Sequence, residues 1–255
     1  MAKQKGIVKL SGTIGDVSFY KSQDGFLARE KGGIDKERIK NDPAFQRTRE
    51  NGQEFGRACK AGRLLRTTFR MLLQNSKDRL VTSRLTKSMM QVIKSDPTNL
   101  RGERTIKAGD QSKLMGFDFN VNSKLGSTFY SPYEVAMNRE TGAINVTIAE
   151  FVPEQMLTAP IGVTHFSIVS GAAIIDYSTE TFEVSLRKTE DIPINNQLQS
   201  IIQQVHELSS NSEGDMYVTL GLEFVEIVNG IRYPLKGTST NCLCIVGLEQ
   251  SALSE

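Results

Sequence analysis

Hydrophobic and polar positions divide the chain into a period-two beginning, a helical stretch and a long period-two end. Between residues 6 and 33, three β-prone runs occur in the order GIVKL, VSFYK and FLARE. Gly15-Asp16 lies in the first gap and Asp24-Gly25 in the second. An Asp-Gly pair between such runs is a strong hairpin signal, so we expect a β meander. A ribbon of two or three strands cannot cover its own apolar face and must dock on another surface.

Two surfaces can receive this ribbon. It can dock on the helices or the β domain of its own chain, or it can reach a neighbouring copy as an arm and add its strands to that copy's sheet. The sequence leaves both possibilities open. The apolar and aromatic residues expected to make the contact are called the arm residues: Val8, Leu10, Val17, Phe19, Tyr20, Phe26 and Leu27.

Residues 42–74 carry the pattern of a long basic helix. Asp42-Pro43 suits a helix start, and apolar residues then recur mostly three, four or seven positions apart. Gly52, Gly56 and Gly62 each weaken a helix by roughly 1 kcal/mol relative to Ala. We therefore expect a break near them, the alternative being a close helix contact that uses their missing side chains. The positions predicted to be buried are Phe45, Phe55, Cys59, Leu65, Phe69 and Leu72.

The same periodicity places a cationic ridge on the other side of this helix. Its members are Lys60, Arg63, Arg66 and Arg70. Residues of this spacing gather on one helix face, where they are either simply solvated or dock something anionic.

A second helix is predicted from about residue 79 to residue 94, after a polar turn at residues 75–78. Because the turn is short, the two helices should pack antiparallel as a helical hairpin. Asp96-Pro97 ends the second helix. Its predicted buried side consists of Leu80, Leu85, Met89, Val92 and Ile93.

Beyond residue 115 the pattern changes to period two. Seven or eight short strands with turn residues about every ten positions indicate an antiparallel, immunoglobulin-like β-sandwich. Residues 198–208, LQSIIQQVHEL, fit either a short helix or a strand. The predicted strands are 117–122, 133–138, 143–151, 165–177, 181–187, 215–228, 231–235 and 242–248, with Asn229-Gly230 as a hairpin turn.

These patterns predict the α+β class and four segments. Residues 1–33 form the β arm, which ends in a joint at Lys31-Gly32-Gly33. Residues 34–97 form the basic helical region. Residues 98–115, polar and rich in turn residues, form a linker. Residues 116–255 form the acidic β-sandwich domain.

Charge is distributed unequally between the two halves. Residues 1–115 hold 25 Lys and Arg against 12 Asp and Glu, a net charge of +13, whereas residues 116–255 hold 6 against 17, a net charge of −11. Such asymmetry is typical of a basic part that meets nucleic acid or an acidic surface. The acidic part of the next copy is one such surface, and a head-to-tail contact of this kind propagates into rings or open filaments.

The composition indicates the cellular compartment in which the protein is expected. No apolar run approaches the roughly 20 residues that span a bilayer, and the start MAKQKGIVKLSG lacks the apolar stretch of a secretory signal. We therefore expect a cytoplasmic protein with no membrane partner, unless a non-classical route exports it. Three cysteines argue against a disulfide framework. Cys242 and Cys244 share a strand face, and without further ligands nearby they indicate no metal site.

No catalytic signature occurs in the sequence. The chain has no Gly-Lys pair for a phosphate loop, and it lacks the motifs G-x-G-x-x-G, H-E-x-x-H and G-x-S-x-G. His165 and His206 have no nucleophile spaced to suggest a pair. We therefore expect no enzyme, no cofactor and no small-molecule substrate.

Three stretches carry a resemblance. They are GTIGDVSFYKSQDGFLAREKGG from residue 12, NDPAFQRTRENGQEFGRACKAGRLLR from residue 41, and LEFVEIVNGIRYPLKG near the C-terminus. Together they resemble an uncharacterised family of conserved hypothetical bacterial proteins, and the similarity spans nearly the whole chain. The resemblance implies an arm, Arg-rich helices and an immunoglobulin-like end, and it transfers no functional residue.

Two functions from different classes follow. In the first, the protein is structural and assembles with other copies of itself into a filament, tube or shell, its arm and basic helices docking on the acidic sandwich of a neighbour. In the second, it binds nucleic acid through the ridge, with Arg47, Arg49 and Arg57 nearby, as a nucleoid-associated or phage-derived protein. Acidic Glu50 and Glu54 and the lack of interleaved aromatic residues count against the second. A phage-derived particle differs from the first function only in its genetic setting.

Overall fold

The structure is a computed structural model that describes residues 1–30, 33–235 and 240–251. Its helices and several antiparallel sheets place it in the α+β class. The chain separates into two units, residues 1–50 and residues 51–255. Of the joint predicted at residues 31–33, the first two residues lie outside the described chain.

The first unit contains a four-stranded antiparallel sheet. It consists of β1 (Ala2–Lys3), β2 (Gly12–Ile14), β3 (Val17–Ser22) and β4 (Gly25–Glu30), in the order β1-β4-β3-β2. Both predicted turn positions are confirmed, because Gly15-Asp16 forms the turn between β2 and β3, and β4 begins at Gly25 with a φ of 105°. Gly supplies this left-handed backbone without strain.

The strand predicted at residues 6–10 is wrong. Instead, the side chain of Gln4 forms hydrogen bonds with both backbone groups of Leu10: Oε1 accepts from Leu10 N at 2.9 Å, and Nε2 donates to Leu10 O at 3.3 Å. These bonds close the intervening residues into a loop, and β1 takes the place beside β4. The side-chain amide of Gln4 thus makes the hydrogen bonds that the backbone of a neighbouring strand would otherwise make with Leu10.

The long helix begins later than its pattern predicts. The carboxylate of Asp35 accepts from Glu37 N and starts a separate helix, α1 (Lys36–Asn41). Asp42 then caps a 3-10 turn, Pro43–Phe45, by accepting from Ala44 N at 2.9 Å. Asp42-Pro43 is thus a helix start as expected, and α2 (Gln46–Thr68) follows from this turn.

The expected break at the glycines does not occur. α2 runs unbroken through all three, and the irregularity comes at Phe69, before the short α3 (Arg70–Leu73). Burial of Ala58, Ala61 and Leu65 against the core outweighs the low helix propensity of glycine. Gly62 fulfils the alternative expectation, since a Cβ built there would lie 3.6 Å from Cγ of Leu85 in the next helix.

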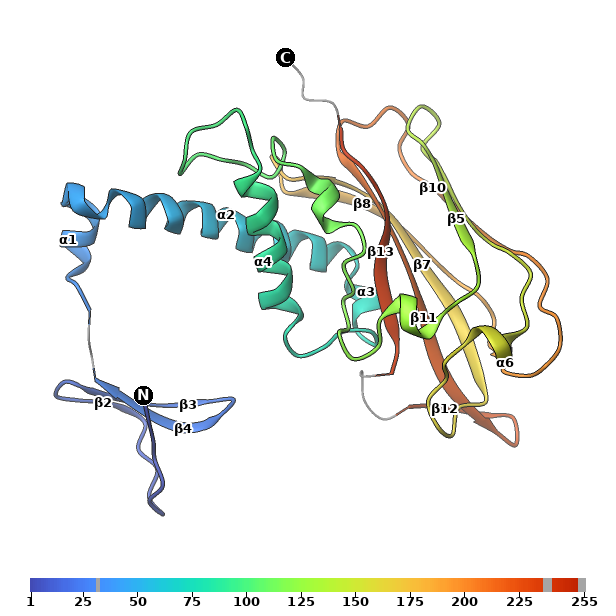
Figure 1. Ribbon diagram of the computed structural model, residues 1–255, viewed down its shortest axis with the longest axis horizontal. Helices are drawn as coiled ribbons and strands as arrows, with labels where there is room; N and C mark the ends of the chain where they lie inside the picture. The colour runs from blue at the N-terminus through green and yellow to red at the C-terminus, as the bar shows by residue number, and fades with distance from the viewer. Residues whose placement is uncertain (31–32, 236–239, 252–255) are drawn as a thin grey trace. The chain divides into compact units, whose positions relative to one another are not determined.

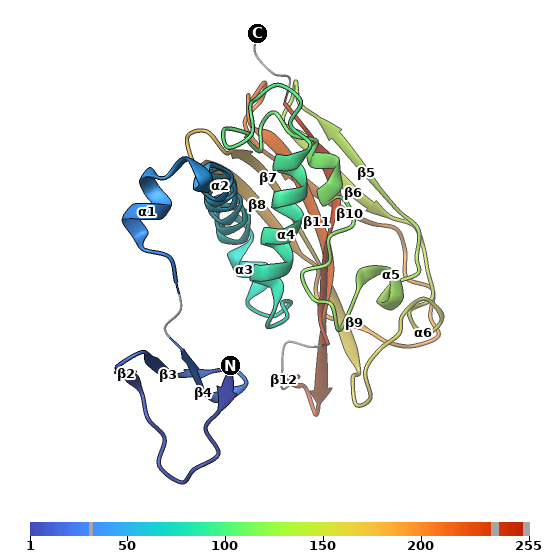
Figure 2. The ribbon, with the colours of Figure 1, turned by 60° about the vertical axis from the view of Figure 1, so that its left-hand side comes forward.

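That next helix, α4 (Val81–Lys94), crosses α2 instead of running antiparallel beside it (Figures 1 and 2). The predicted antiparallel hairpin is therefore wrong. Most of the predicted buried side is confirmed, as Leu85, Met89, Val92 and Ile93 are buried. Phe55 and Leu80, also predicted to be buried, are exposed, and at the crossing α2 instead packs through small residues such as Ala58 and Ala61.

Two antiparallel sheets form the β part of the second unit. The three-stranded sheet has the order β10-β6-β5, and the six-stranded sheet has β11 and β7 at its centre, with β12 and β13 beside β11, and β8 and β9 beside β7. The strands are β5 (Tyr133–Asn138), β6 (Ala143–Ile148), β7 (His165–Asp176), β8 (Thr181–Lys188), β9 (Ile192–Pro193), β10 (Ile202–Glu207), β11 (Asp215–Val228), β12 (Ile231–Pro234) and β13 (Cys242–Glu249).

The six-stranded sheet lies between the helices and the three-stranded sheet (Figure 1). One core cluster joins Leu65, Phe69 and Met89 of the helical layer to Val169 and Tyr217 of this sheet. A second core lies between the two sheets, where Val146 and Ile148 face Phe166 and Leu220. The described residues of both cores belong to the second unit, so helices and sheets there form one packed body.

Seven predicted strands are present, and Asn229-Gly230 forms its hairpin with φ values of 51° and 76°. The ambiguous residues 198–208 contain β10. The strand predicted at 117–122 is wrong, because only Asp118 pairs there, in an isolated bridge with Cys244. The segment 98–115, predicted as a linker, contributes Ile106 and Leu114 to the core shared by the helices and the sheet.

Candidate functional site

The arm residues lie in the first unit and divide between the two faces of its sheet. Cross-strand pairing places Ile14, Val17, Phe19, Phe26 and Ala28 on one face, which we call the apolar arm face, and it places the charged residues Lys21 and Glu30 at the border of that face. Ile14 is 64% exposed and Val17 is 37% exposed, whereas Phe19 and Phe26 are half-buried. A small sheet that leaves such residues in solvent presents a surface suited to a partner.

The remaining arm residues lie elsewhere. Tyr20 and Leu27 form a cross-strand pair on the opposite face, where Leu27 is buried. Val8 and Leu10 belong to the loop closed by Gln4 and are exposed. The loop's Lys9 ammonium lies 5.9 Å from the ring centroid of Phe26. The alternation of residues 17–21 in the sequence correctly separates Val17 and Phe19 from Tyr20, but it does not join them to Ile14 and Phe26 of the neighbouring strands.

The four residues of the cationic ridge differ in exposure and in ion pairing. Lys60 Nζ lies 3.6 Å from Glu180 Oε1 in the β7–β8 turn of the same chain, and both side chains are well exposed, so the pair is weak. Arg63 and Arg70 are exposed. Arg66 is half-buried, and burial together with the charge of Arg63 lowers its pKa. Within the described chain, no ion pair involves these three arginines.

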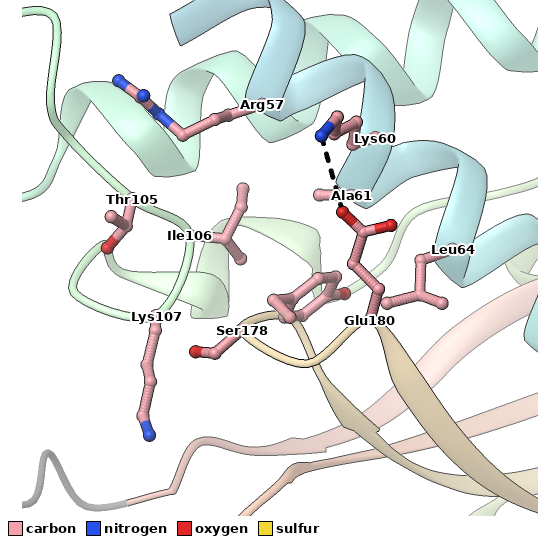
Figure 3. Close-up of a pocket in the computed structure, with 10 residues that line it drawn as sticks. Arg57, Lys60, Ala61, Leu64, Thr105, Ile106, Lys107, Ser178 and Glu180 are labelled. Atoms are coloured by element: carbon pink, nitrogen blue, oxygen red, sulfur yellow. Dashed lines mark ion pairs between the residues drawn. The ribbon is translucent and has the colours of Figure 1, made fainter.

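A pocket of about 200 Å³ lies between α2, the loop after α4 and the β7–β8 turn (Figure 3). Its apolar wall comes from Ala61, Leu64 and Ile106, and Lys60 and Glu180 lie at its edge. The guanidinium of Arg57 is already engaged, because it donates to the carbonyl oxygens of Gly102 and Arg104. The lining holds no His or Cys and no nucleophile paired with a base, so this pocket offers cations and an apolar wall but no catalytic arrangement.

Behind this pocket runs a buried chain of hydrogen bonds. Tyr177 Oη donates to Tyr217 Oη at 3.0 Å, and Tyr217 donates to Gln111 Oε1. Gln111 Nε2 donates to Asp215 Oδ2 at 2.6 Å, and Ser251 N donates to Asp215 Oδ1 at 2.9 Å. Burial raises the pKa of Asp215 and of both tyrosines. The chain satisfies polar groups that would otherwise be costly to bury, which is a structural role.

His206 and the two free cysteines of β13, Cys242 and Cys244, are buried between or within the sheets. His206 Nε2 lies 2.7 Å from Ser170 Oγ, and Nδ1 lies 3.2 Å from Ser185 Oγ. The imidazole is fully buried, so substrate cannot reach this His-Ser contact. Burial, with a smaller effect of Arg187, lowers the pKa of His206 to about 4. Burial raises the pKa of Cys242 to about 12, and burial also raises the pKa of Cys244 above its ordinary value.

A second pocket, of about 390 Å³, was missed by the sequence reasoning. It lies where α2, α3 and the start of α4 meet, and it joins two ridge residues, Arg66 and Arg70, to Lys77 and Arg79. The run Lys77-Asp78-Arg79 carries this signal, although its pattern predicts only the end of a turn and, at Arg79, the start of a helix. We call this pocket the basic pocket.

Two other kinds of feature are absent from the described residues. They contain no group of three or more His, Cys, Asp or Glu side chains placed to hold a metal ion. None of the helices in the described ranges combines the length and apolar character needed to cross a bilayer.

Comparisons of the chain with known protein families, with curated proteins and with solved structures found no match. Function must therefore be argued from the residues themselves.

Proposed function

We propose that this protein is a self-assembling structural protein, in which residues 1–33 of one copy bind a second copy to build a homo-oligomeric filament, tube or shell. The observation that carries the proposal is the apolar arm face. In the first unit, strands β1 to β4 form a single-layer sheet, and a single layer cannot bury its own apolar face. Ile14 and Val17 are exposed there, so a partner surface would stabilise the sheet by covering them.

A second copy is the partner that the chain itself offers. β2 is an edge strand with backbone groups available for strand addition. The charge asymmetry, +13 over residues 1–115 against −11 over residues 116–255, favours head-to-tail contacts between basic helices and the acidic β part of a neighbour. Arg63 and Arg70 remain exposed for such a contact, whereas Lys60 already pairs with Glu180 of its own chain.

The β part supports a further proposal about its form, an immunoglobulin-like sandwich. Two antiparallel sheets face each other across a shared core. The sheets also approach each other at both margins, since β10 lies beside β8 and β13 lies beside β5. The helical layer on the outer face of the six-stranded sheet distinguishes this arrangement from a plain two-sheet sandwich.

The decisive experiment compares the full chain with a variant that lacks residues 1–33, by light scattering after gel filtration and by electron microscopy. Self-assembly predicts that the full chain forms particles of high mass and that the deletion variant is soluble and monomeric. A monodisperse full-length monomer at low salt would refute the proposal. Aggregation of the deletion variant would indicate that the ribbon covers its own chain, and this also contradicts the proposal.

The second candidate, nucleic-acid binding, is favoured by one specific observation. Arg63, Arg66 and Arg70 lie along α2 and α3 without a carboxylate partner in the described structure. One of the acidic residues that counted against this function, Glu54, is buried and therefore does not shield the ridge. If the ridge contacts phosphates, affinity for duplex DNA should fall steeply between about 50 and 200 mM salt. The absence of a gel shift at low salt would exclude this function.

A further inference from the structure

The basic pocket collects cations from three successive segments. Arg66 comes from the end of α2, Arg70 from α3, and Lys77 and Arg79 from the loop before α4. Leu73 and Val81, both buried, provide an apolar base, and the polar side chains of Thr67, Gln74 and Thr82 complete the lining. Four cationic groups that are far apart in an extended chain are thus brought around one hollow of about 390 Å³.

The one carboxylate in the lining, that of Asp78, is engaged elsewhere. It forms an ion pair with Arg84 and accepts from Leu80 N at 2.6 Å and from Val121 N at 2.9 Å. Asp78 is also buried, so it is held by the core and not by the pocket cations. No ion pair within the described residues involves any of the four cations. The pocket therefore has an uncompensated positive charge.

Two further features favour an anion in this place. Arg66 is half-buried, and burial, with a smaller effect of Arg63, lowers its pKa, so an anion in the pocket would stabilise the charged guanidinium. The first turn of α4, which supplies Val81 and Thr82 to the pocket, contains no acidic residue, and the carboxylate of Asp78 that precedes it bonds only Leu80 N of this helix start. Its backbone N–H groups add to the positive potential of the four side chains.

We propose that the basic pocket binds a chain of adjacent phosphate groups, such as inorganic polyphosphate or the triphosphate of a nucleotide. Guanidinium groups match phosphate oxygens in pairs, and phosphate carries more charge per volume than a carboxylate. Four cations require more negative charge than one phosphate supplies, and adjacent phosphates provide it within one small hollow. This site is independent of the apolar arm face and does not rest on self-assembly.

The test is isothermal titration of the full chain with sodium tripolyphosphate, ATP, orthophosphate and adenosine, each at low salt. The site predicts that tripolyphosphate and ATP bind, that orthophosphate binds at least roughly tenfold more weakly, and that adenosine does not bind. Equal affinities for tripolyphosphate and ATP would identify the phosphate chain as the ligand, and tighter binding of ATP would identify a nucleotide. Failure of both triphosphates to bind would overturn the proposal.

Charge-reversal variants test whether tripolyphosphate binds at the basic pocket. Arg70→Glu combined with Lys77→Glu should weaken tripolyphosphate binding at least roughly tenfold, because two charge-assisted contacts become repulsive. Lys94→Glu, which removes an exposed cation at the other end of α4, should leave the affinity within about twofold and serves as the matched control. Should the charge reversals lower stability, Arg70→Gln with Lys77→Gln tests the same contacts. Equal weakening in Lys94→Glu, or binding of a single-stranded oligonucleotide without binding of tripolyphosphate, would contradict the assignment.

Discussion

Arg104 Nε lies 3.0 Å from Oε1 of Glu54, a carboxylate that is only 1% exposed. The same oxygen accepts from Gly102 N at 2.9 Å. One helical turn further on, Arg57 of α2 donates to the backbone carbonyls of Gly102 and Arg104. Two side chains of the long helix thus hold the loop after α4 by its backbone and by its arginine. This explains why a polar, turn-rich segment is packed and does not link separate domains.

The Glu54 contact predicts a large loss of stability on truncation. Glu54→Ala leaves the Arg104 guanidinium without its partner and Gly102 N without its acceptor, so the free energy of unfolding should fall by about 3 kcal/mol. Glu103→Ala, which removes an exposed carboxylate from the same loop, should change it by less than about 0.5 kcal/mol. Urea titrations of the two variants measure the difference. Equal midpoints would show that the loop is not held by Glu54.

The sequence predicted those elements whose signals are local. Period-two strands such as 215–228 and the turn Asn229-Gly230 were found because alternation and turn chemistry are written in adjacent residues. It failed where contacts that do not follow from the local pattern decide. The bonds from Gln4 to Leu10 removed a strand, and the burial of Ala58 and Leu65 carried α2 through its glycines.

The candidate sites also differ in whether a local sequence signal predicts them or only the folded chain brings their residues together. The ridge from Lys60 to Arg70 could be predicted because it follows from helical spacing. The basic pocket could not, because Lys77 and Arg79 join Arg66 and Arg70 only after the chain turns at α3. The apolar arm face likewise depends on strand register, which pairs Val17 with Ile14 and not with a residue of the loop before β2.

Glycines provide a matched pair of stability predictions. At Gly56 a Cβ would meet no atom within 4 Å, so Gly56→Ala should raise the free energy of unfolding by about 0.5–1 kcal/mol through helix propensity. At Gly221 a Cβ would lie 2.1 Å from the carbonyl oxygen of Cys242 on the neighbouring strand. Gly221→Ala should therefore lower it by at least about 2 kcal/mol. Thermal unfolding monitored by circular dichroism measures both, and a tolerated alanine at Gly221 would show that β11 and β13 are less closely paired.

His206 predicts a loss of stability in mild acid. Its pKa in the folded protein is about 4, below the ordinary value of 6.5. Between these two pH values the imidazole is therefore protonated in the unfolded chain and neutral in the folded chain. The stabilisation from the neutral imidazole is complete above pH 6.5 and is lost as the pH falls towards 4, by at most about 3 kcal/mol. Denaturant titrations at several pH values should show this slope in the native protein and a shallower one in His206→Gln.

The cysteines predict selective reactivity. Cys242 and Cys244 are buried, and the raised pKa of each thiol keeps it protonated, whereas Cys59 is half-buried. Since the thiolate is the reactive form, iodoacetamide at about pH 8 should modify Cys59 alone in the folded protein and all three residues after denaturation. Mass spectrometry of peptides gives the sites. Modification of Cys242 at the rate of Cys59 would mean that the core between the sheets opens readily.

Two adjacent residues of β2 test the apolar arm face. Ile14 lies on that face, opposite Val17, whereas Thr13 lies on the other face, opposite Ser18, and both side chains are exposed. A charge on a surface that becomes buried between copies is costly, so Ile14→Asp should reduce the mass of the assembly measured by light scattering. Thr13→Asp adds the same charge to the same strand and should preserve that mass. Because both residues lie outside the two cores, neither variant should shift the unfolding of the second unit. Equal masses for Ile14→Asp and the native chain would show that this face makes no contact between copies.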